Sequence, residues 1–201
     1  MTFASLGNQL KNTLNQRFSP REIHSIHYRF LESVCNVSIA EIIANPKRPL
    51  SASEAAQIIA LETKLLEGVP LQYALGNALF YGLKLKCSPA ALIPRPETEE
   101  LVTWMLSTTA NHGQGRLIDL GTGSGCIPVS FALDRPEWEV YAVDVSEDEL
   151  NVAERNAAMH HAAIQFERDD MLSMAAEASW RTGKFDIMVS NPPYIPVSER
   201  A

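Results

Sequence analysis

The sequence predicts an α/β protein in which a small helical bundle precedes a doubly wound, parallel sheet. Three observations predict it. The first third of the chain carries repeated helix-start signals, the second half alternates apolar strands with helices, and a glycine-rich loop directly follows the first of those strands. Strands that alternate with helices are typical of parallel sheets whose faces are covered by the helices.

The first domain, residues 1–75, is expected to be a bundle of four short helices. Apolar residues recur at helical spacing from Phe3 to Leu14. Three Ser-x-x-Glu patterns, beginning at Ser19, Ser38 and Ser51, indicate capping boxes at the start of three more helices. Helices of this length and spacing pack as a small bundle.

A short connecting segment, residues 76–96, is expected next. Partial alternation of apolar and polar residues between Leu79 and Cys87 predicts one or two short strands, with a hairpin as one arrangement. The run Ile93-Pro94-Arg95-Pro96 predicts an extended linker, because a proline disfavours helix in the residue before it.

The last domain, residues 97–201, opens with a helix from about Glu97 to Ser107 and continues as alternating strands and helices. The strands are expected at Arg116–Leu120, Val140–Asp144, Ile164–Arg168 and Phe185–Ser190, and the helices at Cys126–Leu133 and Ser146–His161. Sheets of this type usually have more than four strands. We therefore expect this domain to be incomplete at its C-terminus, with one edge of the sheet bare.

The charge, cysteine content and hydrophobicity of the chain indicate which kinds of binding partner and compartment to expect. The formal net charge of −7 disfavours direct nucleic-acid binding, because an acidic chain gains little from attraction to phosphates. The three cysteines form no Cys-x-x-Cys pair, no apolar run has membrane-spanning length, and the start lacks the pattern of a signal peptide. We expect a reduced, cytoplasmic monomer without a membrane partner, and we interpret the pair His24-x-x-His27 as structural rather than metal-binding.

The glycine-rich loop suggests a nucleotide-like cofactor. It reads Asp119-Leu120-Gly121-Thr122-Gly123-Ser124-Gly125, a G-x-G-x-G register rather than the G-x-G-x-x-G of dinucleotide sites. This register favours S-adenosylmethionine, which has no diphosphate, although a turn of another nucleotide-binding fold is the alternative. Asp144 ends the next strand, where an acidic residue can accept both ribose hydroxyls. Its alternative role is to cap the helix that follows.

The tetrapeptide Asn191-Pro192-Pro193-Tyr194 directly follows the fourth strand. A planar nitrogen is a poor nucleophile, and a pocket helps it by accepting hydrogen bonds from both of its N–H groups. The side-chain oxygen of Asn191 and the backbone carbonyl of Pro192 provide two such acceptors. The prolines stiffen the turn, and the ring of Tyr194 can pack on a flat acceptor group. The alternative is an ordinary proline-rich turn.

Taken together, these motifs resemble the HemK/PrmC family, the release factor glutamine N5-methyltransferases. Two further segments carry the resemblance: Gly68-Val69-Pro70-Leu71-Gln72-Tyr73-Ala74-Leu75-Gly76, followed by Phe80-Tyr81-Gly82, and Ile93-Pro94-Arg95-Pro96-Glu97-Thr98-Glu99. The resemblance covers about residues 68–196, whereas residues 1–67 match only in kind, as a helical N-terminal domain for substrate recognition.

The resemblance implies S-adenosylmethionine as cofactor and a glutamine side chain of a peptide chain release factor as acceptor. The implied cofactor residues are Gly121, Thr122, Gly123, Ser124, Gly125, Asp144, Asp170, Met171 and Asn191. The implied catalytic and acceptor-binding residues are Asn191, Pro192, Pro193 and Tyr194. Met171 departs from the aromatic residue usual beside adenine, and Asp169 offers a rival register to Asp170. The alternatives are an adenine-N6 DNA methyltransferase and a non-catalytic factor-binding module.

Overall fold

The computed structural model describes residues 1–172, 180 and 183–192. The chain divides into two compact units, Met1–Leu75 and Gly76–Ala201. Each unit has its own hydrophobic core.

The first unit contains only helices in its described part. They are α1 (Phe3–Leu14), α2 (Pro20–Cys35), α3 (Ile39–Ala44), α4 (Ala52–Leu66) and α5 (Leu71–Leu75). The capping boxes expected at Ser19, Ser38 and Ser51 are all present, each with the glutamate three residues on. The fifth helix, α5, was not predicted, because five residues are too few to show a helical period.

Apolar side chains from all five helices form the core of this unit. Phe3, Leu6, Leu10 and Leu14 of α1 are all buried, as their spacing predicted. His27 lies at the edge of this core, where its Nε2 atom is 2.8 Å from the backbone carbonyl oxygen of Phe3. This contact gives His27 a structural role.

The second unit begins with a β-hairpin. Strand β1 (Asn77–Phe80) pairs antiparallel with β2 (Leu83–Lys86). The two turn residues, Tyr81 and Gly82, have φ angles of 50° and 75°, as a two-residue hairpin turn of type I′ requires. The backbone N–H of Tyr81 also donates to the carboxylate of Glu99, at 2.9 Å. That glutamate lies in the first turn of α6 (Pro96–Thr108), so the hairpin turn is tied to this helix.

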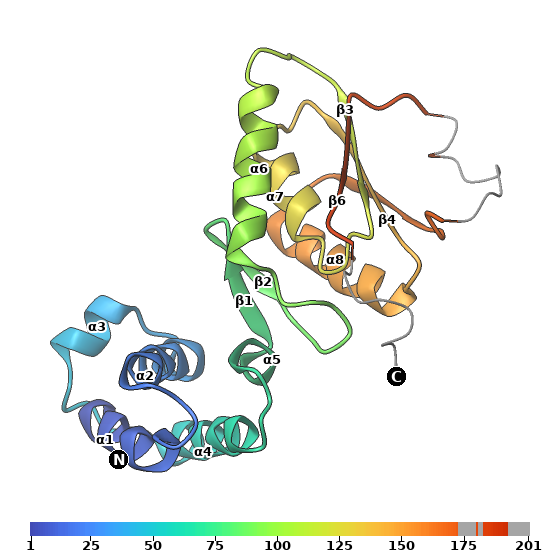
Figure 1. Ribbon diagram of the computed structural model, residues 1–201. Coiled ribbons are helices and arrows are strands. Elements are labelled where there is room, and N and C mark those ends of the chain that lie inside the picture. The colour runs from blue at the N-terminus through green and yellow to red at the C-terminus, as the bar shows by residue number, and fades with distance from the viewer. Residues whose placement is uncertain (173–179, 181–182, 193–201) are drawn as a thin grey trace. The chain divides into compact units, whose positions relative to one another are not determined.

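The remaining strands form one parallel sheet with the order β5-β4-β3-β6. They are β3 (Arg116–Leu120), β4 (Glu139–Asp144), β5 (Ile164–Arg168) and β6 (Ile187–Ser190). Helices α6, α7 (Cys126–Asp134) and α8 (Glu147–His160) lie on one face of this sheet (Figure 1). The predicted α/β fold with a parallel sheet after a helical region is therefore confirmed, and every predicted strand and helix of this part is present.

Two clusters of apolar side chains cover the two faces of the sheet. The larger cluster joins residues of the hairpin and of the three helices to Leu117, Val140 and Val189 of the sheet. The smaller cluster lies on the opposite face, where Trp180 packs with Ile118 and neighbouring residues. The central strands β3 and β4 are thus largely buried on both faces, whereas β5 and β6 keep exposed positions. Burial on both faces explains why the central strands read as nearly continuous apolar runs.

The strand order creates a switch point between β3 and β6. From β3 the chain adds β4 and then β5 on one side, and then returns to place β6 on the other side. Leu120 and Ser190, the last residues of β3 and β6, are register partners. The loops that follow these two strands therefore start side by side. In open α/β sheets, ligands bind at such a point, outside the carboxyl ends of the strands.

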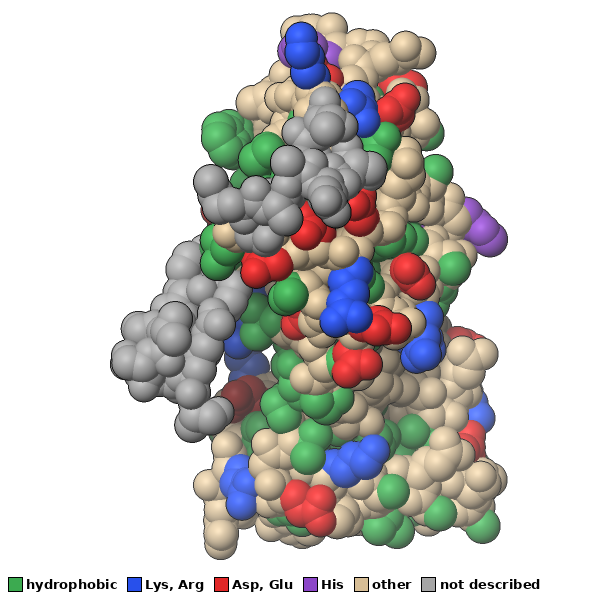
Figure 2. Space-filling view, turned by 90° about the vertical axis from the view of Figure 1, so that its right-hand side faces the viewer, with side chains coloured by type: hydrophobic (Ala, Val, Ile, Leu, Met, Phe, Trp, Pro, Cys, Tyr) green, Lys and Arg blue, Asp and Glu red, His purple; other side chains and the backbone are tan. Residues whose placement is uncertain are grey.

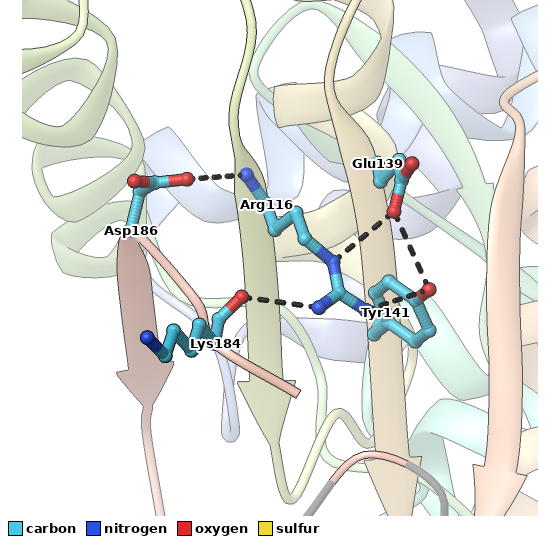
Figure 3. A network of polar contacts seen from close by, with 5 residues as sticks. All are labelled: Arg116, Glu139, Tyr141, Lys184 and Asp186. Carbon is cyan, nitrogen blue, oxygen red and sulfur yellow. Dashed lines mark hydrogen bonds and ion pairs between the residues drawn. The ribbon is translucent and has the colours of Figure 1, made fainter. Parts of the chain in front are cut away.

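A polar network fastens the opposite, amino ends of three strands around Arg116 (Figure 3). Its guanidinium donates to the carboxylate of Glu139 at 3.1 Å, to the hydroxyl of Tyr141 at 2.9 Å and to the backbone carbonyl of Lys184 at 3.1 Å. Its backbone N–H donates to the carboxylate of Asp186 at 2.8 Å. These contacts hold the segment that leads into β6 against β3. They therefore fix the pairing of these two strands at the end opposite the switch point.

Candidate functional site

A small cavity of about 60 Å³ lies at the carboxyl ends of β3 and β6. Its lining combines three stretches that are far apart in the sequence: residues 92–95 with Thr98, residues 121–124 of the glycine loop with the start of α7, and Asn191. The switch point thus brings the glycine loop and Asn191, both predicted as site residues, into one cavity.

The glycine loop needs glycine at three positions for its backbone conformation. Gly121, Gly123 and Gly125 have φ angles of 73°, 55° and 74°, which side chains rarely allow. Among the described residues, no atom lies within 4 Å of a β-carbon placed on Gly123, so the backbone there faces space that a ligand can approach. At Gly125 the same β-carbon would lie only 2.8 Å from the β-carbon of Ala153 in α8. Gly125 is therefore also required for packing.

Asp144 holds the glycine loop through its carboxylate. One oxygen accepts the backbone N–H of Gly123 at 2.9 Å, and the other accepts the backbone N–H of Ser146 at 3.0 Å. The second contact supports the N-cap of α8, which was the alternative role considered for this residue. A carboxylate has about four acceptor sites, so two bonds leave capacity for ligand hydroxyls. Asp144 lies beside the cavity rather than in its lining.

Asp119 is a buried carboxyl that sequence reasoning did not select as a site residue. Neither of its side-chain oxygens, nor the hydroxyl of Thr122, has a hydrogen-bond partner among the described residues. Burial raises the pKa of Asp119 to about 7. The nearby Thr122 hydroxyl acts in the opposite direction, and the negative charge of Asp144 raises the pKa further. Buried polar atoms normally have partners. This group beneath the loop is therefore suited to a polar or cationic ligand.

Glu149 adds a second carboxyl with a shifted titration. Burial raises its pKa to about 7, and the neighbouring Asp144 contributes in the same direction. Its backbone N–H donates to the hydroxyl of Ser146 at 3.3 Å, which places Glu149 in the first turn of α8. Asp119 and Glu149 therefore hold protons near neutral pH more readily than exposed carboxylates do.

Asn156, a fully buried residue of α8, holds the glycine loop from behind. Its amide nitrogen donates to the backbone carbonyl oxygens of Ser124 and Lys86, at 2.9 Å and 3.2 Å, and its oxygen accepts the N–H of Lys86 at 2.6 Å. One side chain thus connects α8, the hairpin and the loop. Sequence reasoning missed it, because a lone asparagine in a helix carries no motif.

The acidic segment after β5 lies close to the loop but outside the cavity lining. A β-carbon on Gly121 would lie 3.8 Å from the methyl carbon of Met171, so Met171 contacts the loop. The carboxylate of Asp170 accepts the backbone N–H of Leu172 at 2.9 Å. The carboxylate of Asp169 accepts the indole N–H of Trp180 at 2.8 Å. Both aspartates thus make local contacts, and the adenine role of Asp170 and Met171 stays a prediction.

The exit of β6 presents Asn191 to the cavity. Its side-chain nitrogen donates to the hydroxyl of Thr98 at 3.2 Å, and both residues line the cavity. Ser190, just before it, donates from its hydroxyl to the backbone carbonyl of Leu120 at 2.7 Å, which ties the ends of β6 and β3 together. Pro192 is half-buried. Pro193 and Tyr194, the other predicted acceptor residues, lie outside the described residues.

Cys126 lines the cavity at the start of α7, but its thiol is poorly suited to nucleophilic chemistry. Burial raises its pKa to about 12, so the thiol is protonated at neutral pH. The thiolate is the reactive form of cysteine. Cys126 is instead a small buried helix residue that packs in the larger apolar cluster.

The charges on the protein surface do not gather into a basic groove on the face shown in Figure 2. There, Lys and Arg side chains are separated by acidic and apolar ones. Among the described residues, no helix is both long and apolar enough to cross a bilayer.

Comparisons with known proteins agree with these motifs. Residues 6–76 match the PrmC N-terminal domain, and residues 99–199 match the Methyltransferase small domain. A release factor glutamine methyltransferase of Flavobacterium psychrophilum is 34% identical over 97% of this chain and 68% of its own length. The corresponding protein of Streptococcus pneumoniae is 35% identical over 97% of this chain and 67% of its own.

The chain belongs to the release factor glutamine methyltransferase family. The resemblance stated from the motifs is thereby confirmed. A further member, from Chlorobaculum tepidum, is 40% identical over 85% of this chain and 60% of its own length. The chain thus spans about 60 to 68% of the length of these three relatives. Members of this family are S-adenosylmethionine-dependent methyltransferases, so the family implies that cofactor.

Proposed function

We propose that this chain carries the cofactor site and the acceptor loop of an enzyme that methylates the side-chain amide nitrogen of a glutamine in a peptide chain release factor. The observation that carries the proposal is the common cavity of the glycine loop and Asn191. Methyl transfer needs the donor and the acceptor nitrogen in line and in contact, and a shared cavity provides this proximity. Alignment of reactants is worth up to about 7–11 kcal/mol in favourable systems.

The residues around the glycine loop fit S-adenosylmethionine. The open space over Gly123 admits a ligand against the backbone, and Asp144 retains acceptor capacity for two ribose hydroxyls. The carboxyl of Asp119 and the hydroxyl of Thr122, which have no hydrogen-bond partner in the described part of the chain, suit the cationic amino group of the methionine part. We assign Gly121–Gly125 to the methionine and ribose, and Asp170 with Met171 to the adenine. When bound, the cofactor supplies a methyl group on a positively charged sulfur.

Asn191 and Pro192 would hold the acceptor amide. Two N–H groups of a glutamine side chain need two acceptors, and the side-chain oxygen of Asn191 and the carbonyl of Pro192 are proposed to provide them. Pro193 would fix the direction of that carbonyl, and Tyr194 would pack on the flat amide. A methylated, protonated amide is strongly acidic, so its proton leaves to water without a dedicated base. This accounts for the lack of a general-base candidate among the described cavity residues.

The N-terminal unit is proposed to recognise the release factor. Support comes from isoleucines exposed on its helices, since Ile39 and Ile43 of α3 are 47% and 63% exposed and Ile59 of α4 is 50% exposed. Apolar side chains left in water are common in protein-binding surfaces. We expect Ile43→Ser to raise the KM for the release factor and to leave the Kd of the cofactor unchanged. An unchanged KM would argue against this role.

The test of the proposed function is methyl transfer from isotopically labelled S-adenosylmethionine. The full chain is incubated with a release factor or with duplex DNA, and mass spectrometry locates the added methyl group. We expect one methyl on a glutamine of the release factor. Asn191→Ala should lower the rate about 10²–10³-fold, by analogy with the loss of one oxyanion-hole contact. Label on adenine, or none on any substrate, would overturn the proposal.

Asn151→Ala is the matched control, because Asn151 is exposed on α8 and away from the cavity. We expect its rate to stay at the wild-type level.

We also place the enzyme in the cytoplasm as a monomer. Its three free cysteines, two of them buried, suit a reducing compartment. Sedimentation of the purified chain measures its oligomeric state.

A further inference from the structure

The contact between Thr98 and Asn191 joins two segments whose sequence motifs gave no sign of being connected. The residues are 93 positions apart, yet the Asn191 nitrogen donates to the Thr98 hydroxyl at 3.2 Å. Both residues line the same cavity as the glycine loop. The contact is therefore part of the site itself.

Thr98 is held firmly by its surroundings. It is the third residue of α6 and only 6% exposed. Its backbone N–H donates to the carbonyl of Arg95 at 3.0 Å. Its neighbour Glu99 accepts the backbone N–H of Tyr81 from the hairpin turn at 2.9 Å. These contacts restrain the first turn of α6. The Thr98 hydroxyl therefore has a fixed position from which it can orient a neighbouring side chain.

The orientation of the Asn191 amide decides which of its atoms meets a ligand. The nitrogen and the oxygen are the two ends of one planar group, so a bond from the nitrogen to Thr98 turns the oxygen away from Thr98. Without that bond, the side chain loses one of the contacts that restrain its terminal torsion, which is broad in asparagine. Only the oxygen can accept an N–H group.

We propose that Thr98 is a positioning residue that orients the Asn191 amide, so that its oxygen is directed at the N–H group of the acceptor. The inference rests on the proposed function, in which Asn191 holds the acceptor amide. It explains why a threonine follows Ile93-Pro94-Arg95-Pro96 at this place in the helix turn. Thr98 acts through Asn191 and does not itself contact the reacting atoms.

Thr98→Val tests the proposal, because valine keeps the shape of threonine and removes the hydroxyl. We expect kcat to fall about 3- to 10-fold, the effect of one net hydrogen bond, while the Kd of the cofactor stays the same. Thr98→Ser, which keeps the hydroxyl, should retain most of the activity. Thr103→Val is the matched control, since Thr103 is exposed on α6 and its hydroxyl bonds only to the backbone of its own helix, at Glu99.

A double-mutant cycle separates positioning from a general structural effect. In the Asn191→Ala background, Thr98→Val should cause no further loss, because the side chain that it orients is gone. An equal loss in both backgrounds would overturn the proposal, and so would a Thr98→Ser protein as slow as Thr98→Val.

Nuclear magnetic resonance of the Asn191 side-chain NH₂ group gives a result that does not depend on turnover. We expect one of its two protons to be protected from exchange in the wild type and in Thr98→Ser, and to exchange faster in Thr98→Val. If the wild type methylates nothing while this pattern holds, the proposed function fails and the positioning role stands. Identical NH₂ signals in wild type and Thr98→Val would refute the positioning role.

Discussion

Asn156, buried within α8, donates a 2.9 Å hydrogen bond from its side-chain nitrogen to the backbone carbonyl of Ser124 in the glycine loop. The same amide pairs with both backbone groups of Lys86 in the hairpin. The conformation of the loop therefore depends on a helix residue 32 positions further along the chain.

Removing this amide should destabilise the second unit. Asn156→Ala leaves buried backbone groups of Ser124 and Lys86 without a partner, and we expect the free energy of unfolding to fall by about 3 kcal/mol. Urea denaturation measures it. Asn151→Ala, on the exposed side of the same helix, should change it by less than about 0.5 kcal/mol. Equal urea midpoints for both variants would show that the hydrogen bonds of Asn156 contribute nothing to stability.

Gly125→Ala should be poorly tolerated. The new methyl group would lie 2.8 Å from the β-carbon of Ala153, and the φ of 74° is strained for alanine. Overpacking and strain together should cost about 3 kcal/mol, and the affinity for S-adenosylmethionine should fall with them. Thermal unfolding and calorimetry test the two effects. Gly113→Ala is the control, because a β-carbon there meets no atom within 4 Å.

Asp144→Asn should weaken cofactor binding even though its shape is unchanged. The two carboxylate oxygens each accept a backbone N–H, from Gly123 and Ser146. An asparagine has one oxygen, so its NH₂ group must face one of these donors. We expect at least a 10-fold rise in the Kd of S-adenosylmethionine, measured by calorimetry, from the loss of a charge-assisted bond of about 1.5–3 kcal/mol. A Kd equal to that of the wild type would contradict this account.

Asp119 should make stability decrease as the pH rises from about 4 to about 7. Its folded pKa of about 7 lies above the ordinary value, so in this range the folded state keeps a proton that the unfolded state has lost. This group then lowers the free energy of unfolding by about 1.4 kcal/mol per pH unit, and the slope ends above pH 7. Urea denaturation across this range should give a flatter profile for Asp119→Asn. Parallel profiles would exclude the effect.

Glu149 titrates in the same range and in the same direction, since its pKa is also raised to about 7. Glu149→Gln is therefore the companion variant for the Asp119 experiment. Comparing each variant with the wild type removes the opposite trend from exposed glutamates such as Glu22, whose pKa is lowered by hydrogen bonds to Ser19.

Signals that lie close together in the sequence predicted most of the fold. A capping box is completed within four residues, so it predicts the start of a helix at each of Ser19, Ser38 and Ser51. The strands were equally visible, because a buried parallel strand is a continuous apolar run. The missed helix α5 shows the limit of this reasoning, since one turn of helix has no measurable period.

The site was predictable only where its residues form motifs. The glycine loop and Asn191, which the motifs selected, both line one cavity, because both follow strand ends. The supporting contacts of Thr98 and Asn156 join residues 93 and 32 positions apart, and no local pattern records them. The burial of Asp119 depends on what packs over the loop, which requires the folded structure.

The pairing of Leu120 with Ser190 has a consequence for biosynthesis. These neighbours are 70 residues apart, so β6 cannot join the sheet until the ribosome has released all of the intervening chain. Closing so long a loop costs entropy that is repaid only when the strands pair. A nascent chain can thus complete its helical N-terminal unit early, whereas its ligand cavity forms only at the end of synthesis of this segment.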